Sequence, residues 1–133
     1  MPRPARTVAV LTLPLLLTAC SGGGGTQSSP QSVTATVYDD FHAGEFAKAC
    51  ALVLPAAMAR FTAAGTDCQS FFAKQYDPGK RAGLADVKVD KNAIQVNGDT
   101  AVVPESAVTF GGHPSSDGDT RLALQDGKWF VAG

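Results

Sequence analysis

The fold of this chain is decided over residues 83–103, which read GLADVKVDKNAIQVNGDTAVV. Within residues 85–90, small or apolar residues alternate with charged ones, which is the two-residue period of a half-buried strand. Residues 94–96 indicate a second strand, and Asn97-Gly98 predicts a tight hairpin turn after it, because these residue types accept positive φ angles. Upstream of this stretch the apolar period is helical, so the chain divides into a helical half and a strand half.

Three further strands are expected downstream, over about 100–110, around Leu122 and Leu124, and over 128–132. Pro104 lies inside the first of these and predicts a bulge or an edge position, because proline has no N–H for a sheet. A polar Gly/Pro/Ser loop is expected over residues 111–119. Asp126-Gly127 predicts a second hairpin turn between the last two strands.

Four helices are expected in the first half, over residues 31–43, 45–54, 56–64 and 67–76. Gly44 closes the first helix as a C-terminal glycine, and Pro55 ends the second helix and opens the third. Gly65 stops the third helix, and residues 66–69 match the pattern of a capping box for the fourth. The sequence Asp-Pro-Gly at residues 77–79 then ends the helical half.

Helices followed by an antiparallel meander predict an α+β domain over residues 31–133, with the N-terminal helices packed on one face of a curved antiparallel sheet. In this order of elements the chain resembles the NTF2-like (cystatin-like) superfamily, and in particular its small bacterial lipoproteins of unassigned function. The resemblance is carried by Val37–Cys50, the hairpin Asn97–Val103 and the terminal strand Gly127–Val131. It implies a cone-shaped pocket between helices and sheet. Because Pro55, Gly65 and the cysteines divide and staple the helical half, we expect this pocket to be small or filled.

The N-terminus has the pattern of a secretory signal peptide. Arg3 and Arg6 precede an apolar run over residues 7–18, and small residues follow the run. The run is far shorter than the roughly 20 residues that a transmembrane helix needs. We therefore expect residues 1–19 to be a signal peptide that is removed.

The signal peptide ends in Leu17-Thr18-Ala19-Cys20, which resembles the lipobox of bacterial lipoproteins. In that family the cysteine carries a diacylglyceryl group, so the resemblance implies palmitate-type acyl chains on Cys20. These would hold the protein on the extracytoplasmic side of the cell membrane, and residues 20–30 would form a flexible Gly/Ser tether. The alternative is cleavage after Ala19, which would release a secreted protein with a free thiol.

The other two cysteines, Cys50 and Cys68, form an even pair in an exported chain, which predicts one disulfide between the second and fourth helices. Closing a loop of this size is worth about 3 kcal/mol in the chain-entropy model. There is no CxxC spacing, and His42 and His113 lie far from both cysteines in sequence. We therefore expect neither a metal site nor a cofactor.

Charge and composition exclude one class of partner. The chain has 11 Lys and Arg residues against 12 Asp and Glu residues, and Arg3 and Arg6 belong to the expected signal peptide. The remaining chain is net acidic and lacks the basic footprint of a nucleic-acid binder. It also lacks a polybasic segment for anionic lipid, so membrane attachment would depend on the acyl chains alone.

Two functions from different classes fit the sequence. The favoured one is a non-catalytic module that presents its sheet or a modest pocket to an envelope protein, a glycan or a small ligand, with the outer face of the sheet as the candidate surface. The alternative is a small enzyme of the isomerase or hydratase type, because some NTF2-like domains use an Asp base with a Tyr or His partner. Tyr38 and His42, four residues apart on the first helix, and Asp40 beside them are the candidate catalytic residues. An apolar pocket that encloses a buried acid would favour the enzyme, and a filled cone would favour the binding module.

Overall fold

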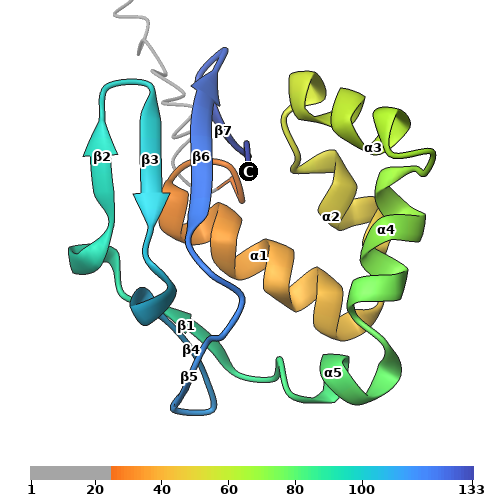
Figure 1. Ribbon diagram of the computed structural model, residues 1–133. Helices are drawn as coiled ribbons and strands as arrows, with labels where there is room; N and C mark the ends of the chain where they lie inside the picture. The colour runs from red at the N-terminus through yellow and green to blue at the C-terminus, as the bar shows by residue number, and fades with distance from the viewer. Residues whose placement is uncertain (1–24) are drawn as a thin grey trace, which may run out of the picture.

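The computed structural model describes residues 25–133, which form an α+β domain with helices and two antiparallel sheets (Figure 1). The expected signal peptide and Cys20 lie outside these residues. No helix within residues 25–133 is long and apolar enough to span a bilayer. The helical elements are α1 (Pro30–Ala43), α2 (Phe46–Ala51), the 3-10 helix η2 (Pro55–Met58), α3 (Ala59–Ala63), α4 (Cys68–Gln75) and α5 (Pro78–Ala82).

Helix α1 has the limits that its sequence signals predict. Ser29 caps its N-terminus by exchanging hydrogen bonds with Ser32, and Gly44 ends it in the left-handed conformation (φ 72°). Contacts with the domain begin before the expected tether ends: the carbonyl of Gln27 accepts a hydrogen bond of 3.0 Å from the backbone N–H of Trp129. The Gln27 side-chain amide also donates to the Trp129 carbonyl. The segment just before α1 is therefore fixed to the last strand.

Two details of the later helices differ from the prediction. The capping box expected at residues 66–69 is wrong, because Asp67 is the cap of α4 and accepts hydrogen bonds from the backbone N–H and the hydroxyl of Ser70. A carboxylate suits this place, since its charge also interacts favourably with the helix dipole. Helix α5 was not predicted at all. Pro78 occupies its first turn, where a missing N–H costs nothing, and the Asp77 side chain caps it.

The strands form a four-stranded sheet of order β2-β3-β6-β7 and a three-stranded sheet of order β1-β4-β5, and all pairs are antiparallel. The first sheet contains β2 (Gln95–Asn97), β3 (Thr100–Val103), β6 (Thr120–Gln125) and β7 (Lys128–Val131). The second contains β1 (Val87–Val89), β4 (Val108–Phe110) and β5 (His113–Pro114). β5 lies within the stretch that we expected to be loop throughout.

The single long strand expected over residues 100–110 is wrong, and so is the simple meander. Pro104 leads into a 3-10 helix, Glu105–Ala107, that separates β3 from β4 and directs them into different sheets. β1 consequently pairs with β4 instead of β2, with Val87 opposite Phe110. The prediction allowed Pro104 a local bulge, whereas the missing N–H together with the helical turn ends the strand.

Both predicted hairpins are present, with one shift of register. Asn97 pairs with Thr100, so the two turn residues are Gly98 (φ 60°) and Asp99, one position later than predicted. In the second hairpin, Asp126 and Gly127 form the turn as predicted, and both have positive φ.

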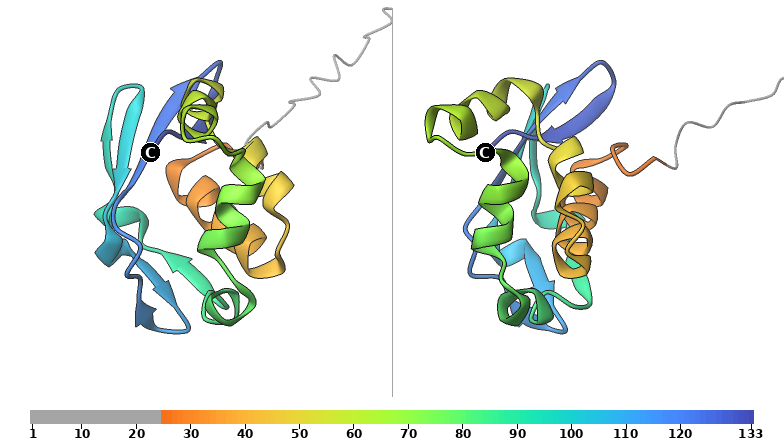
Figure 2. Two further views of the ribbon diagram at one scale, coloured as in Figure 1. Left: turned by 45° about the vertical axis from the view of Figure 1, so that its right-hand side comes forward. Right: turned by 90° about the vertical axis from the view of Figure 1, so that its right-hand side faces the viewer.

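Helix α1 lies across one side of the sheets and contacts β1, β3 and β7 (Figures 1 and 2). Helices α2 and α5 flank α1, and α4 packs on α2. The Cys50–Cys68 disulfide joins α2 to α4, which confirms the predicted pairing. The helices therefore form a layer on one side of the sheets, with α3 and α4 standing away from the strands (Figure 2).

Candidate functional site

A cavity of about 430 Å³ lies between α1, α3, α4 and the strand segments next to them, so the expected pocket is modest in size but is not filled. After α2 the chain is tied to the edge of β7, where the Leu54 N–H donates to the Val131 carbonyl and the Val131 N–H donates to the Leu52 carbonyl. Pro55 then starts η2, and α3 follows it on the other side of the cavity from Thr120 (Figure 1). Pro55 and Gly65 divide the helical half, and we expected this to leave the pocket small or filled. In the structure the pocket between the helices and the strands is open.

The lining of the cavity is mostly aromatic and aliphatic, and it draws on α1, α3, α4, the segment before β6 and the end of β7. It consists of Thr34, Val37, Tyr38, Phe41, Val53, Arg60, Phe61, Ala64, Phe71, Phe72, Tyr76, Asp117, Asp119, Thr120, Val131 and Gly133.

The aromatic rings of the lining form one continuous cluster. Phe41 of α1 stacks on Tyr76 with ring centroids 4.3 Å apart, and it also contacts Phe72 at 4.7 Å. Phe61 of α3 continues the cluster through Phe71 at 5.2 Å. These stacked and tilted contacts bury apolar surface along the wall of the cavity.

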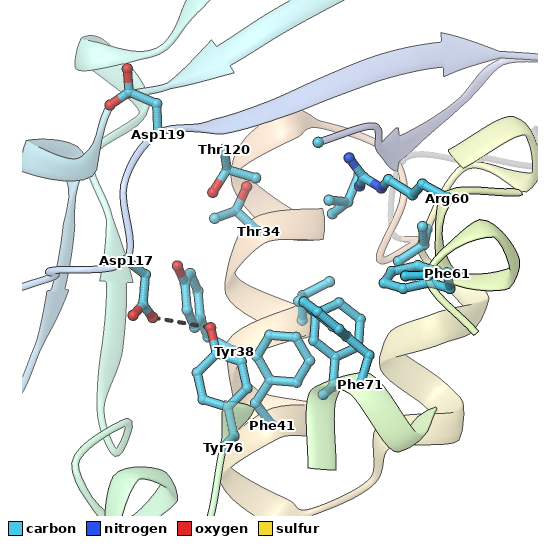
Figure 3. A pocket seen from close by; sticks show the side chains of 16 residues that line it. Thr34, Tyr38, Phe41, Arg60, Phe61, Phe71, Tyr76, Asp117, Asp119 and Thr120 are labelled. Carbon is cyan, nitrogen blue, oxygen red and sulfur yellow. Dashed lines mark hydrogen bonds between the residues drawn. The ribbon is translucent and has the colours of Figure 1, made fainter. Parts of the chain in front are cut away.

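The polar groups of the cavity gather at one end (Figure 3). There the Tyr76 hydroxyl donates a hydrogen bond of 3.1 Å to the Asp117 carboxylate, and the Tyr38 ring lies beside this pair. Thr34 and Thr120 lie next to each other above Tyr38. The Asp117 carboxylate also pairs with the Lys80 ammonium at 3.3 Å, and this ammonium lies 4.6 Å from the centre of the Tyr76 ring.

Both tyrosines have a raised pKa at this end of the cavity. Burial is the largest cause for Tyr38 and for Tyr76, and the negative charge of Asp117 raises both further. The side chains of Ser115 and Thr120 act in the opposite direction on the pKa of Tyr38. The two hydroxyls therefore stay protonated at neutral pH and can donate as well as accept hydrogen bonds.

The opposite end of the cavity carries one positive charge. Arg60 of α3 is exposed at the rim, beside Gly133, and its guanidinium lies 5.7 Å from the centre of the Phe61 ring. Among residues 25–133, Arg60 makes no ion pair. The cavity is thus an apolar space between a partly buried carboxylate at one end and an exposed guanidinium at the other.

The three candidate catalytic residues are not brought together. Tyr38 lines the cavity, but Asp40 and His42 do not. Asp40 is 9% exposed. Burial is the main cause that raises the pKa of its carboxyl group, and the negative charge of Glu45 at the start of α2 raises it further. His42 is exposed, and its Nδ1 lies 2.7 Å from the carbonyl oxygen of Arg81 on α5.

Sequence analysis missed Tyr76 and Asp117, which supply most of the polar end. Asp117 belongs to the stretch expected to be a polar loop, and nothing in that composition indicates that the loop folds over a cavity. One signal was present: the chain contains two tyrosines, and both lie at this site. Within residues 25–133, no group of three or more His, Cys, Asp or Glu side chains is placed to hold a metal ion.

No protein-family model, curated protein or solved structure matches this chain.

Proposed function

We propose that this chain is a lipid-anchored protein of the cell envelope, and that its NTF2-like domain binds a small, mostly apolar molecule in the cavity without transforming it. The anchor is inferred from the lipobox at Cys20, and the NTF2-like assignment from the order of helices and strands. The disulfide between Cys50 and Cys68 supports an oxidising, extracytoplasmic location.

The observation that carries the proposal is the lined cavity itself. Its volume of about 430 Å³ lies in the range of small-molecule sites. Its aromatic walls offer apolar contact, and a few polar groups at one end can fix the orientation of a ligand.

The outer face of the sheet offers less to a partner. The exposed Val96 of the edge strand β2 does not belong to this face, because it lies opposite the buried Ala101. The apolar side chains of the outer face are Val102, Ala123 and Phe130, and all three are half-buried. A protein interface needs an apolar centre that becomes buried on binding, and side chains that are already half-buried leave less apolar surface for one. We therefore place the binding site inside the cavity, with a small ligand as the partner and an envelope protein on the outer face as the competing prediction.

A cavity-blocking variant tests this proposal. Ala64 lines the rim and is exposed, so Ala64→Trp would place an indole in the entrance without disturbing the core. Ala63→Trp is the matched control, because Ala63 is exposed in the same helix but does not line the cavity. We expect the apolar fluorophore N-phenyl-1-naphthylamine to bind the wild type and Ala63→Trp. Binding to Ala64→Trp should be weaker by ~10-fold or more.

Equal binding of the fluorophore by all three proteins would contradict the cavity as the site. Absence of binding by the wild type would contradict the proposed function. Near-ultraviolet circular dichroism of each variant checks that the fold is kept.

An apolar cavity bordered by an acid meets the criterion given above for the alternative function, a proton-transfer enzyme of the isomerase type. We keep it as the second candidate, because this acid, Asp117, is already paired with Lys80 and two of the three predicted catalytic residues do not line the cavity. Asp117 borders an apolar cavity and is oriented by Tyr76, which is the environment of a general base. The test is exchange of the α-hydrogens of 4-phenylbutan-2-one in D₂O. The second candidate predicts exchange that the wild type accelerates and Asp117→Asn does not. Binding without any acceleration by the wild type would leave the binding module as the function.

The lipid anchor is tested separately with Cys20→Ala. We expect the wild type to be found in the membrane fraction with acyl chains in its intact mass, and the variant to lack them. A wild type that is wholly soluble and has no acyl mass would contradict the anchor but not the cavity.

A further inference from the structure

Asp117 makes the two ends of the cavity chemically unequal. Its side chain is only 15% exposed and faces rings of Tyr76 and Tyr38 (Figure 3). A partly buried carboxylate interacts more strongly with a nearby cation than an exposed one does, because less water screens it. Arg60 at the other end is exposed, so its attraction for an anion is largely screened.

The protein already places one ammonium group against this carboxylate. Lys80 Nζ lies 3.3 Å from Asp117 and 4.6 Å from the centre of the Tyr76 ring, which combines an ion pair with a cation–π contact. Lys80 does not line the cavity, whereas Asp117 borders both the cavity and the shallow hollow next to Lys80. Lys80 therefore reaches the carboxylate from outside the cavity.

Further hydrogen-bond acceptors line the same end of the cavity as Asp117. An ammonium group has three N–H donors and no acceptor. Asp117, the Tyr38 hydroxyl and the Thr120 hydroxyl can each accept one hydrogen bond at this end. Beyond them, the rings of Phe41, Phe61 and Phe71 offer only apolar contact.

From these contacts we propose that the cavity selects an amphiphilic amine, with its ammonium group at Asp117 and its apolar body against the aromatic rings. This inference rests on the proposed function, because it names the class of ligand for the same cavity. A ligand amine would share Asp117 with Lys80.

Three probes of one shape test the charge preference: 4-phenylbutylamine, 4-phenylbutanol and 4-phenylbutyrate, each titrated into the purified protein at pH 7 by calorimetry. They share the phenyl ring and differ in being cationic, neutral and anionic. We expect the amine to bind ~10-fold more tightly than the alcohol, and the carboxylate more weakly than the alcohol.

Three variants assign the preference to Asp117. Asp117→Asn keeps an acceptor for the Tyr76 hydroxyl but removes the charge, so the amine should lose its ~10-fold advantage over the alcohol. Lys80→Met removes the competing cation and should tighten amine binding ~3-fold, with no effect on the alcohol. Asp99→Asn, in the β2–β3 turn away from the cavity, is the control and should change neither probe.

The outcomes separate the inference from the function on which it rests. If the alcohol binds as tightly as the amine, or the carboxylate binds best, the amine preference is wrong while the cavity remains a binding site. If none of the three probes binds and N-phenyl-1-naphthylamine also fails to bind, the proposed function is wrong. If Asp117→Asn fails to fold, two measurements still test the amine preference. They are the ranking of the three probes on the wild type and the tighter amine binding expected for Lys80→Met.

Discussion

The two sides of helix α1 are packed differently. Toward the sheets, α1 meets small branched side chains that are almost completely buried, such as Val103, Val108 and Leu122. Toward α3 and α4, the same helix meets large rings, and Phe71 and Phe72 there are only half-buried. One side of α1 is a filled core, and the other borders the cavity. The domain therefore has a stable half, where α1 packs closely on the sheets, and a half with incomplete packing, where α1 faces α3 and α4.

The chemistry of the side chains explains this difference. Branched aliphatic side chains on a pleated sheet interdigitate with those of a helix and leave few voids. The rings of Phe61, Phe71 and Phe72 are carried by helices of five and eight residues, and such short helices are barely stable alone. The Cys50–Cys68 disulfide and the ties of Leu52 and Leu54 to β7 hold these helices in place.

The largest expected effect comes from breaking the filled side. Leu122 is 2% exposed, so Leu122→Ala should lower the free energy of unfolding by about 2–5 kcal/mol. Phe71→Leu, on the cavity side, should cost less than about 1.5 kcal/mol, because the ring is half-buried and space is already present. Urea denaturation of both variants measures the difference. Equal losses of stability would mean that the two sides are packed alike.

Removing the disulfide should affect the cavity side selectively. The Cys50→Ala/Cys68→Ala double variant should lose about 3 kcal/mol of stability, in line with the size of the closed loop. Hydrogen exchange should become faster in α3 and α4 than in β6 and β7, whose ladder does not depend on the bond. A uniform increase across both groups of amides would contradict this division of the domain.

The sequence predicts the filled side better than the cavity side. Alternation and turn residues locate β1, β6 and β7, because each depends on neighbours within a few residues. The split at Pro104, the helix after Asp77 and the position of Asp117 depend on distant partners such as Tyr76, which local patterns do not contain. Tyr38 was predicted as a site residue because it lies on a strongly periodic helix. The residues that lie beside it in the cavity were not predicted.

Alkaline titration of the two tyrosines sharpens the comparison at the polar end. The pKa values of Tyr38 and Tyr76 are raised in the folded state. Above a pH of about 10, the unfolded chain therefore releases tyrosine protons that the folded protein retains. Stability conferred by the neutral hydroxyls is therefore lost as the pH rises beyond that point. We expect tyrosinate absorbance to appear only together with loss of circular dichroism. Reversible ionisation near the ordinary value in a protein that stays folded would contradict a buried polar end.

The smallest expected effect concerns Asp40, which belongs to α1 but does not line the cavity. Its raised pKa means that the folded state binds the proton more tightly, so stability falls as the pH rises from the ordinary pKa through the raised one. Asp40→Asn should remove this dependence, whereas Asp39→Asn, at an exposed neighbour, should retain it. Thermal melts between pH 3 and 7 provide the measurement, and identical profiles for the wild type and Asp40→Asn would refute the assignment.

The central claim, that the incomplete side of α1 is a binding site, is tested most directly by NMR on protein labelled in its tyrosine rings. Tyr38 and Tyr76 are the only tyrosines of the chain, so two sets of ring signals report on the cavity. Titration with 4-phenylbutanol should shift both sets saturably in the wild type and in Ala63→Trp, and much less in Ala64→Trp. Ring signals that do not move at saturating probe, or that move equally in Ala64→Trp, would contradict the claim.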